Sequence, residues 1–98
     1  MNQDVRPTGV AVPDDVLVQR LPDGDSVFLN LATEEYYGLD ATGTSMWAAL
    51  SETGDVERAL DRLREEFDAD QEVLRRDLDA LVQRLLDRGL LRGGDATP

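Results

Sequence analysis

The chain has 98 residues, of which 41% are hydrophobic, and it carries a formal net charge of -11 with neither cysteine nor histidine. This length predicts one domain with a modest core, and the missing residue types exclude disulfides, thiolate nucleophiles, imidazole bases and the commonest metal ligands. All 10 basic residues are arginines and 21 residues are acidic, so most of the surface should repel a phosphate backbone.

Both ends of the chain are expected to be loose, because they hold proline and glycine without a regular apolar pattern. We therefore expect a flexible N-terminal tail at 1–15, a folded domain at 16–92 and a disordered C-terminal tail at 93–98. The first residues show no secretory signal, and no stretch approaches the roughly 20 apolar residues of a membrane span. The sequence predicts a soluble, cytoplasmic protein without a membrane partner.

The first half of the domain predicts a small antiparallel sheet. VLVQRL at 16–21 and SVFLNL at 26–31 have the composition of strands, and the PDGD between them is a hairpin signal built on Asp-Gly. After a second short turn, ATEE, the sequence YYGL supplies a third strand. Its alternation places Tyr37 and Leu39 on one side and Tyr36 on the other.

The second half predicts three helices, each preceded by a residue that can cap it. Asp40 and Thr42 are both candidate caps for the first helix, because their side-chain oxygens can accept from the free N–H groups of a first turn. Asp55 precedes the second helix, DVERALDRLREEF, in which apolar residues recur at helical spacing. Asp70 opens a longer third helix with a leucine stripe, and Gly89 ends it. The predicted fold class is α+β, with a three-stranded antiparallel sheet followed by three helices.

The third strand is a candidate open edge of this sheet. Natural proteins usually blunt an edge with charge or proline, and YYGL contains neither. Such an edge can accept a peptide strand, with backbone hydrogen bonds giving affinity and side-chain pockets giving specificity. Tyr36 and Tyr37 would supply pocket walls, and Gly38 would let another backbone come close. The plainer interpretation makes Tyr37 and Leu39 core residues and Tyr36 a half-exposed strand tyrosine.

Two longer stretches resemble a known family. VFLNLATEEYYGLDATGTSMWAAL is similar to the segment of PqqD-like proteins in which an aromatic pair precedes Gly-Leu-Asn/Asp, a Thr-Gly and a Trp on the first helix. LREEFDADQEVLRRDLDALVQRLLDRGLL resembles their third helix and its Gly-Leu-Leu ending. The resemblance covers about residues 16–92. These proteins are the RiPP recognition elements, the peptide-recognition modules of ribosomal natural-product pathways.

The resemblance implies a winged-helix-like fold in which the leader of a precursor peptide adds a strand beside the third strand, against the third helix. The Tyr-Tyr-Gly-Leu-Asp-x-Thr-Gly stretch resembles the free-standing leader-binding proteins of lasso-peptide pathways more than the pyrroloquinoline quinone chaperone, which is the alternative. Such a module has no catalysis or cofactor of its own. The implied partners are the precursor peptide, a leader peptidase and, indirectly, a cyclase.

Position by position, the resemblance assigns peptide contacts to the third strand and the third helix. Arg75 is the expected ion-pairing partner of an acidic leader residue. On an ideal helix, Asp77, Arg84 and Arg88 lie on one shoulder of the leucine stripe and Arg75 lies on the other, and the sequence leaves open which shoulder faces the peptide. The candidate peptide-binding residues are Glu34, Glu35, Tyr36, Tyr37, Gly38, Leu39, Leu74, Arg75, Asp77, Leu78 and Leu81.

Two further hypotheses belong to other classes. A winged helix that binds nucleic acid should have a basic reading helix, whereas the third helix mixes Arg with Asp and Glu, so no nucleic-acid partner is expected. A structural role as an enzyme subunit or as the remnant of a fused domain stays open. Neighbouring carboxylates such as Asp14 and Asp15 do not indicate acid–base chemistry, and the acidic residues lack the spacing of a calcium loop.

Overall fold

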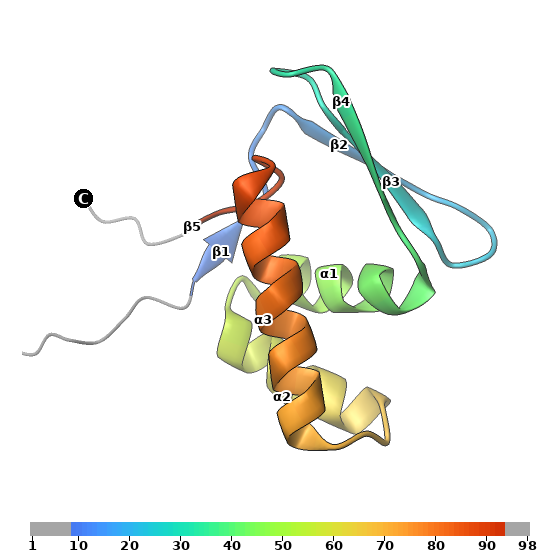
Figure 1. The fold of residues 1–98 in the computed structure, drawn as a ribbon, viewed down its shortest axis with the longest axis vertical. Coiled ribbons are helices and arrows are strands. Elements are labelled where there is room, and N and C mark those ends of the chain that lie inside the picture. The colour runs from blue at the N-terminus through green and yellow to red at the C-terminus, as the bar shows by residue number, and fades with distance from the viewer. Residues whose placement is uncertain (1–8, 94–98) are drawn as a thin grey trace, which may run out of the picture.

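A computed structural model describes residues 9–93 of the chain, and Figure 1 shows its architecture. Three strands form an antiparallel sheet in the order β2-β3-β4, and three helices follow them in the chain. This arrangement confirms the predicted α+β class and the order of its elements. The strands are β2 (Val16–Arg20), β3 (Ser26–Asn30) and β4 (Glu35–Leu39), and the helices are α1 (Ala41–Thr53), α2 (Val56–Glu66) and α3 (Gln71–Asp87).

A second, two-stranded sheet joins β1 (Val10–Ala11) to β5 (Arg92–Gly93). Val10 is buried, and its N–H donates to the carbonyl of Gly54 at the end of α1, 3.0 Å away. This strand corrects the N-terminal tail predicted to extend through residue 15, because backbone and side chain of Val10 are both held by the domain. Gly93 likewise lies in a strand and not in the predicted tail. Residues 1–8 and 94–98 of the two tails lie outside the described residues.

Alternation along β3 directs every second side chain into the core. Ser26, Phe28 and Asn30 are buried, and Phe28 packs edge-on against Trp47 of α1 with ring centroids 5.2 Å apart. The hydroxyls of Ser26 and Thr44 share a buried hydrogen bond of 2.6 Å, which satisfies two polar groups where α1 crosses the sheet. The sheet and α1 are therefore fixed to each other by apolar and polar contacts.

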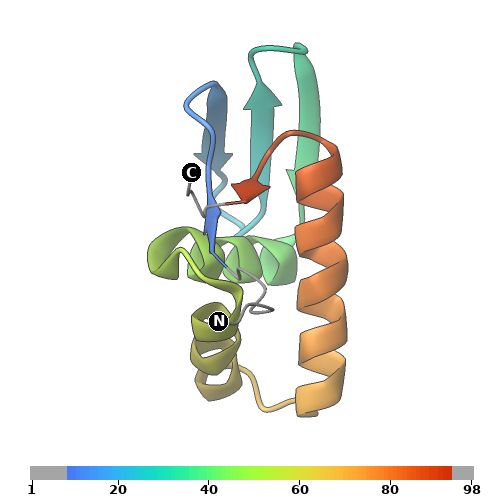
Figure 2. The ribbon, with the colours of Figure 1, turned by 90° about the vertical axis from the view of Figure 1, so that its left-hand side faces the viewer.

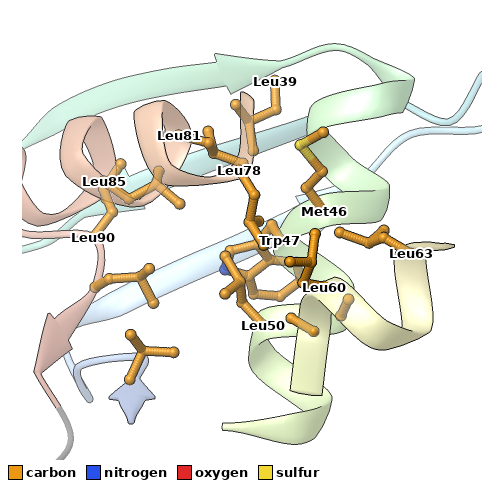
Figure 3. Packing of buried hydrophobic residues seen from close by; sticks show 14 of the residues in the cluster. Leu39, Met46, Trp47, Leu50, Leu60, Leu63, Leu78, Leu81, Leu85 and Leu90 are labelled. Carbon is orange, nitrogen blue, oxygen red and sulfur yellow. The ribbon is translucent and has the colours of Figure 1, made fainter. Parts of the chain in front are cut away.

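Leucines from the other helices complete this core. Figure 3 shows Trp47 beside side chains of α1 and α2, with Leu78, Leu81 and Leu85 of α3 above it. The stripe predicted from the sequence is buried along its whole length, and burial of one such side chain is worth about 1.5–3 kcal/mol. Its members are Leu74, Leu78, Leu81 and Leu85.

Aspartates cap all three helices. Asp40 accepts from the N–H of Gly43 at 2.8 Å, so it and not Thr42 caps α1. Asp55 and Asp70 accept in the same way at the starts of α2 and α3, as predicted. Over the described residues, no helix combines the length and apolar character that crossing a membrane requires.

Candidate functional site

The hydrogen bonds beside β2 and β3 fix which backbone groups of the sheet face which way. Leu31 donates to the carbonyl of Asp15 at 2.8 Å, and Leu21 donates to that of Asp25 at 2.9 Å. Antiparallel strands alternate hydrogen-bonded and non-bonded pairs. The odd-numbered residues of β3 therefore bond to β2, and its even-numbered residues bond to β4.

The free edge of β4 follows from this alternation. The even-numbered residues of β3 pair with Glu35, Tyr37 and Leu39, so these three residues direct their backbone groups toward β3. The N–H and C=O groups of Tyr36 and Gly38 point away from the sheet, and within residues 9–93 no strand pairs with that side of β4. The structure thus has the open third strand that the sequence predicted.

Side chains on the two faces of β4 have different surroundings. Tyr36 projects outward and is 71% exposed, whereas Leu39 is buried in the core and Tyr37 is half-buried on the side of the helices. Glu34 lies just before β4, in the turn from β3, with a positive φ of 63°. Glu34 therefore belongs to the turn, and the side chains available beside the free edge come from Glu35, Tyr36 and Tyr37.

The shoulder of α3 that carries Asp77, Arg84 and Arg88 faces β4. Nε of Arg84 donates to the hydroxyl of Tyr37 at 3.1 Å, and the guanidinium carbon of Arg88 lies 5.1 Å from the centroid of the Tyr37 ring. Figure 2 shows the C-terminal half of α3 alongside β4, at the opposite edge of the sheet from β2. These contacts show that this shoulder of α3, and not the one that carries Arg75, faces β4.

Arg75 lies on the other shoulder of α3. Its two terminal nitrogens donate to the carboxylate of Glu57 on α2, at 2.7 and 3.2 Å, and these hydrogen bonds raise the pKa of Arg75 above its ordinary value. Leu74 and Leu78 are at most 4% exposed and belong to the core. Together with the buried Leu39, four of the predicted contact residues therefore have side chains that do not face the free edge of β4.

A cavity of about 200 Å³ lies between the first turn of α1 and α3. Met46 and Leu81, both buried, provide its apolar part. Its polar lining includes Asp40, Asp77 and Arg84. The full lining is Asp40, Thr42, Gly43, Met46, Asp77, Ala80, Leu81 and Arg84.

A second, shallow hollow lies toward the start of β4 and is bordered by Glu35, Tyr37 and Arg88. Tyr37 and Arg84 lie between the hollow and the cavity. We call the two depressions and this contact between them the β4–α3 groove. Asp77 and Leu81 were predicted contact residues, and both line the cavity. Asp40 and Met46 were not predicted, because a helix cap and a core methionine each have an ordinary structural explanation.

Asn30 of β3 holds the end of α3 in place. Its side-chain N–H donates to the carbonyl of Arg88 at 3.2 Å, and its side-chain oxygen accepts from the N–H groups of Ala32 and Thr33 in the turn to β4. Gly89 follows with a φ of 72°, and a Cβ there would lie only 3.0 Å from the amide nitrogen of Asn30. One buried amide therefore sets the position of α3 relative to the turn that leads into β4.

A larger cavity of about 460 Å³ lies on the other side of α1, beneath the turn between β2 and β3. Small residues such as Gly24 and Ser45 line it, and the ion pair of Arg62 with Glu52 lies at its rim. None of its lining residues comes from β4 or α3. Another hollow, bordered by Tyr36, lies on the outer face of the sheet among residues of β2 and β3. The β4–α3 groove is the candidate site, because it combines the free strand edge with the facing shoulder of α3.

The fold and the groove define a small α+β domain in which an open strand edge runs beside a helix. Residues 25–91 match the family described as coenzyme PQQ synthesis protein D (PqqD). The chain belongs to this family, and the PqqD-like resemblance seen in its sequence is confirmed. No protein with a curated description matches the chain.

Two solved structures share the fold. The structure described as TbiB1 in complex with the TbiA(beta) leader peptide is 32% identical to this chain, with a TM-score of 0.77 over 89% of this chain and 99% of that one. Another, described as lasso peptide synthetase B1 complexed with the leader peptide, is 21% identical, with a TM-score of 0.74 over 86% of this chain and 98% of that one. At this lower identity, the second likeness concerns the fold alone.

Proposed function

We propose that this chain binds the leader region of a ribosomally made precursor peptide in a lasso-peptide pathway, without catalysing a reaction. The observation that carries this proposal is the free edge of β4 beside a groove, in a chain 32% identical to a protein described in complex with a leader peptide. Backbone hydrogen bonds along such an edge give affinity for an extended peptide, and neighbouring depressions select its side chains.

The leader peptide adds to β4 as a further strand of the sheet. The outward N–H and C=O groups of Tyr36 and Gly38 form the hydrogen bonds, and Gly38 presents no side chain to the incoming backbone. Peptide side chains on the helix side then enter the β4–α3 groove. There Met46 and Leu81 support the apolar part of a peptide side chain, while Tyr37 and Arg84 contact the segment beside it.

The bound leader is presented to a leader peptidase and, indirectly, to a cyclase, in the cytoplasm where precursor peptides are made. A peptide held along one strand edge keeps its other edge and its outward side chains accessible. That arrangement suits a module that holds a substrate for a second protein.

The description of the family favours one alternative, a chaperone for the precursor peptide of pyrroloquinoline quinone. The same strand edge would bind that peptide, so the two functions differ in the ligand and not in the site. A DNA-binding function has less support, because the net charge is -11, Arg75 is paired with Glu57, and Arg84 and Arg88 are engaged with Tyr37.

The test is a fluorescence-polarisation titration with labelled leader peptides from precursor genes that neighbour this one, with a scrambled leader as the control. We expect a dissociation constant at or below about 1 μM for one leader, equivalent to about 8 kcal/mol, and at least about tenfold weaker binding of the scrambled peptide. Binding of a pyrroloquinoline quinone precursor alone would favour the alternative. A folded protein that binds none of these peptides would contradict the proposed function.

A further inference from the structure

Charges of opposite sign occupy different parts of the β4–α3 groove. Asp40 and Asp77 line the cavity near the end of β4, whereas Arg88 borders the hollow near its start. Arg84 lines the same cavity where it contacts Tyr37, and Glu35 borders the hollow beside Arg88. A peptide in this groove therefore meets the two carboxylates of the cavity before it reaches Arg84 and Arg88.

Arg84 is positioned to receive an anionic group. Its Nε is held by Tyr37, and among residues 9–93 neither Arg84 nor Arg88 forms an ion pair, unlike Arg62, Arg64 and Arg75. Guanidinium groups pair with carboxylates through their remaining N–H groups. Arg84 and Arg88 therefore keep N–H groups that can bind a carboxylate of the peptide.

The acidic part has the opposite preference. One oxygen of Asp40 already caps α1 by accepting from Gly43, and Asp77 has no hydrogen-bond or ion-pair partner among the described residues. Both carboxylates are exposed at the lining of one cavity. A cationic side chain entering this cavity would find acceptor oxygens on both carboxylates.

The distance between the two parts sets the spacing in the peptide. Asp77 and Arg84 are separated by two helical turns, about 10 Å along the axis. An extended peptide rises about 3.3 Å per residue and directs every second side chain to the same face. Same-face residues two apart span about 6.6 Å and those four apart span about 13 Å, which bracket the separation on the helix. The two matching charges in the peptide are therefore two or four residues apart.

We propose that the groove selects leader peptides in which a basic residue is followed, two or four residues later, by an acidic one. The basic residue pairs with Asp77 and the acidic residue pairs with Arg84. The order assumes that the peptide runs antiparallel to β4, the more stable and more frequent pairing of strands. This inference rests on the proposed function and adds the chemistry that distinguishes one leader from another.

The experiment reverses one charge at a time and measures binding of the labelled leader that binds the wild-type protein. Arg84→Glu is compared with Arg76→Glu, which makes the same change in net charge on an exposed residue of α3 that lines neither depression. We expect Arg84→Glu to weaken binding at least about tenfold and Arg76→Glu no more than about twofold.

A rescue experiment separates recognition from general repulsion. Replacing the acidic leader residue by lysine should restore most of the binding of Arg84→Glu and weaken binding of the wild-type protein. Equal effects of Arg84→Glu and Arg76→Glu, or a tightly bound leader without the basic–acidic order, would overturn this inference and leave the proposed function standing. Failure of the wild-type protein to bind any leader would instead contradict the proposed function itself.

Discussion

The hydroxyl of Tyr37 on β4 accepts a hydrogen bond from Nε of Arg84 on α3, at 3.1 Å. This bond joins the two sides of the β4–α3 groove between its two depressions, and Arg88 stacks on the ring of the same tyrosine. A long arginine side chain loses considerable rotational freedom when it binds a ligand. Because Tyr37 already restrains Arg84, part of this entropic cost is met before the peptide arrives.

Tyr37→Phe should weaken peptide binding without unfolding the domain. The change removes the hydroxyl that restrains Arg84 and keeps the ring that Arg88 contacts. We expect about a two- to fivefold increase in the dissociation constant and a loss of less than about 1.5 kcal/mol in the free energy of unfolding. Polarisation titration and urea denaturation measure the two quantities. An unchanged affinity would show that the restraint on Arg84 plays no part in binding.

Gly38 offers a direct test of strand addition. Its N–H faces away from β3, so Gly38→Pro removes a donor from the free edge and leaves the bonds between β3 and β4 intact, as proline at an edge strand allows. We expect Gly38→Pro to weaken leader binding at least about tenfold, since it deletes a backbone hydrogen bond and blocks the approaching strand.

Gly38→Ala is the matched control. A Cβ at this position would meet no atom closer than the carbonyl oxygen of Ser26, 3.9 Å away, and alanine keeps the N–H. Its affinity should stay within about threefold of the wild type, the change expected from a single exposed methyl group. If the proline variant remains folded by circular dichroism and binds as well as the alanine variant, the peptide does not add to β4.

The sequence predicted the fold well because its signals are local. The alternation in SVFLNL, the Asp-Gly turn and the capping aspartates each depend on residues close together in the chain, and the structure confirms the elements that they predicted. The pair β1 and β5 was missed. Each strand has two residues, too few for a periodic pattern, and Val10 pairs with Gly93 at the far end of the chain.

The site was less predictable because it depends on contacts between distant residues. Helical periodicity placed Arg84 and Arg88 on the same shoulder, but the contacts with Tyr37 that orient this shoulder join different elements. Arg75 was preferred because nothing near it in the sequence shows that Glu57, from another helix, binds it. Asn30 gave no signal, since one polar residue at the end of a strand is common.

Arg75→Ala tests the revised assignment of the basic residue. The side chain is exposed, binds Glu57 on α2 and lies on the shoulder of α3 away from Tyr37. Peptide affinity should therefore change by less than about twofold, the effect of one screened surface charge. Measured beside Arg84→Ala, for which we expect about a two- to fivefold loss, it compares two arginines of the same helix. A larger loss of affinity for Arg75→Ala than for Arg84→Ala would mean that Arg75 contacts the peptide.

Asn30→Asp should destabilise the domain by removing the link between β3 and the end of α3. The aspartate keeps an oxygen for the N–H groups of Ala32 and Thr33 and loses the donor to the carbonyl of Arg88. Leaving that carbonyl without its partner at a part-buried position should lower the free energy of unfolding by about 1–2 kcal/mol. The buried Trp47, the only tryptophan, provides a fluorescence signal for urea denaturation.

Arg88→Ala is the control for this last prediction, because it keeps the carbonyl that accepts from Asn30 and removes only the exposed side chain. Its stability should stay within about 1 kcal/mol of the wild type, since an exposed cation–π contact contributes little. Asn30→Asp should also weaken leader binding, because the end of α3 is then free to shift relative to β4. Wild-type stability in Asn30→Asp would mean that packing of the leucine stripe alone positions α3.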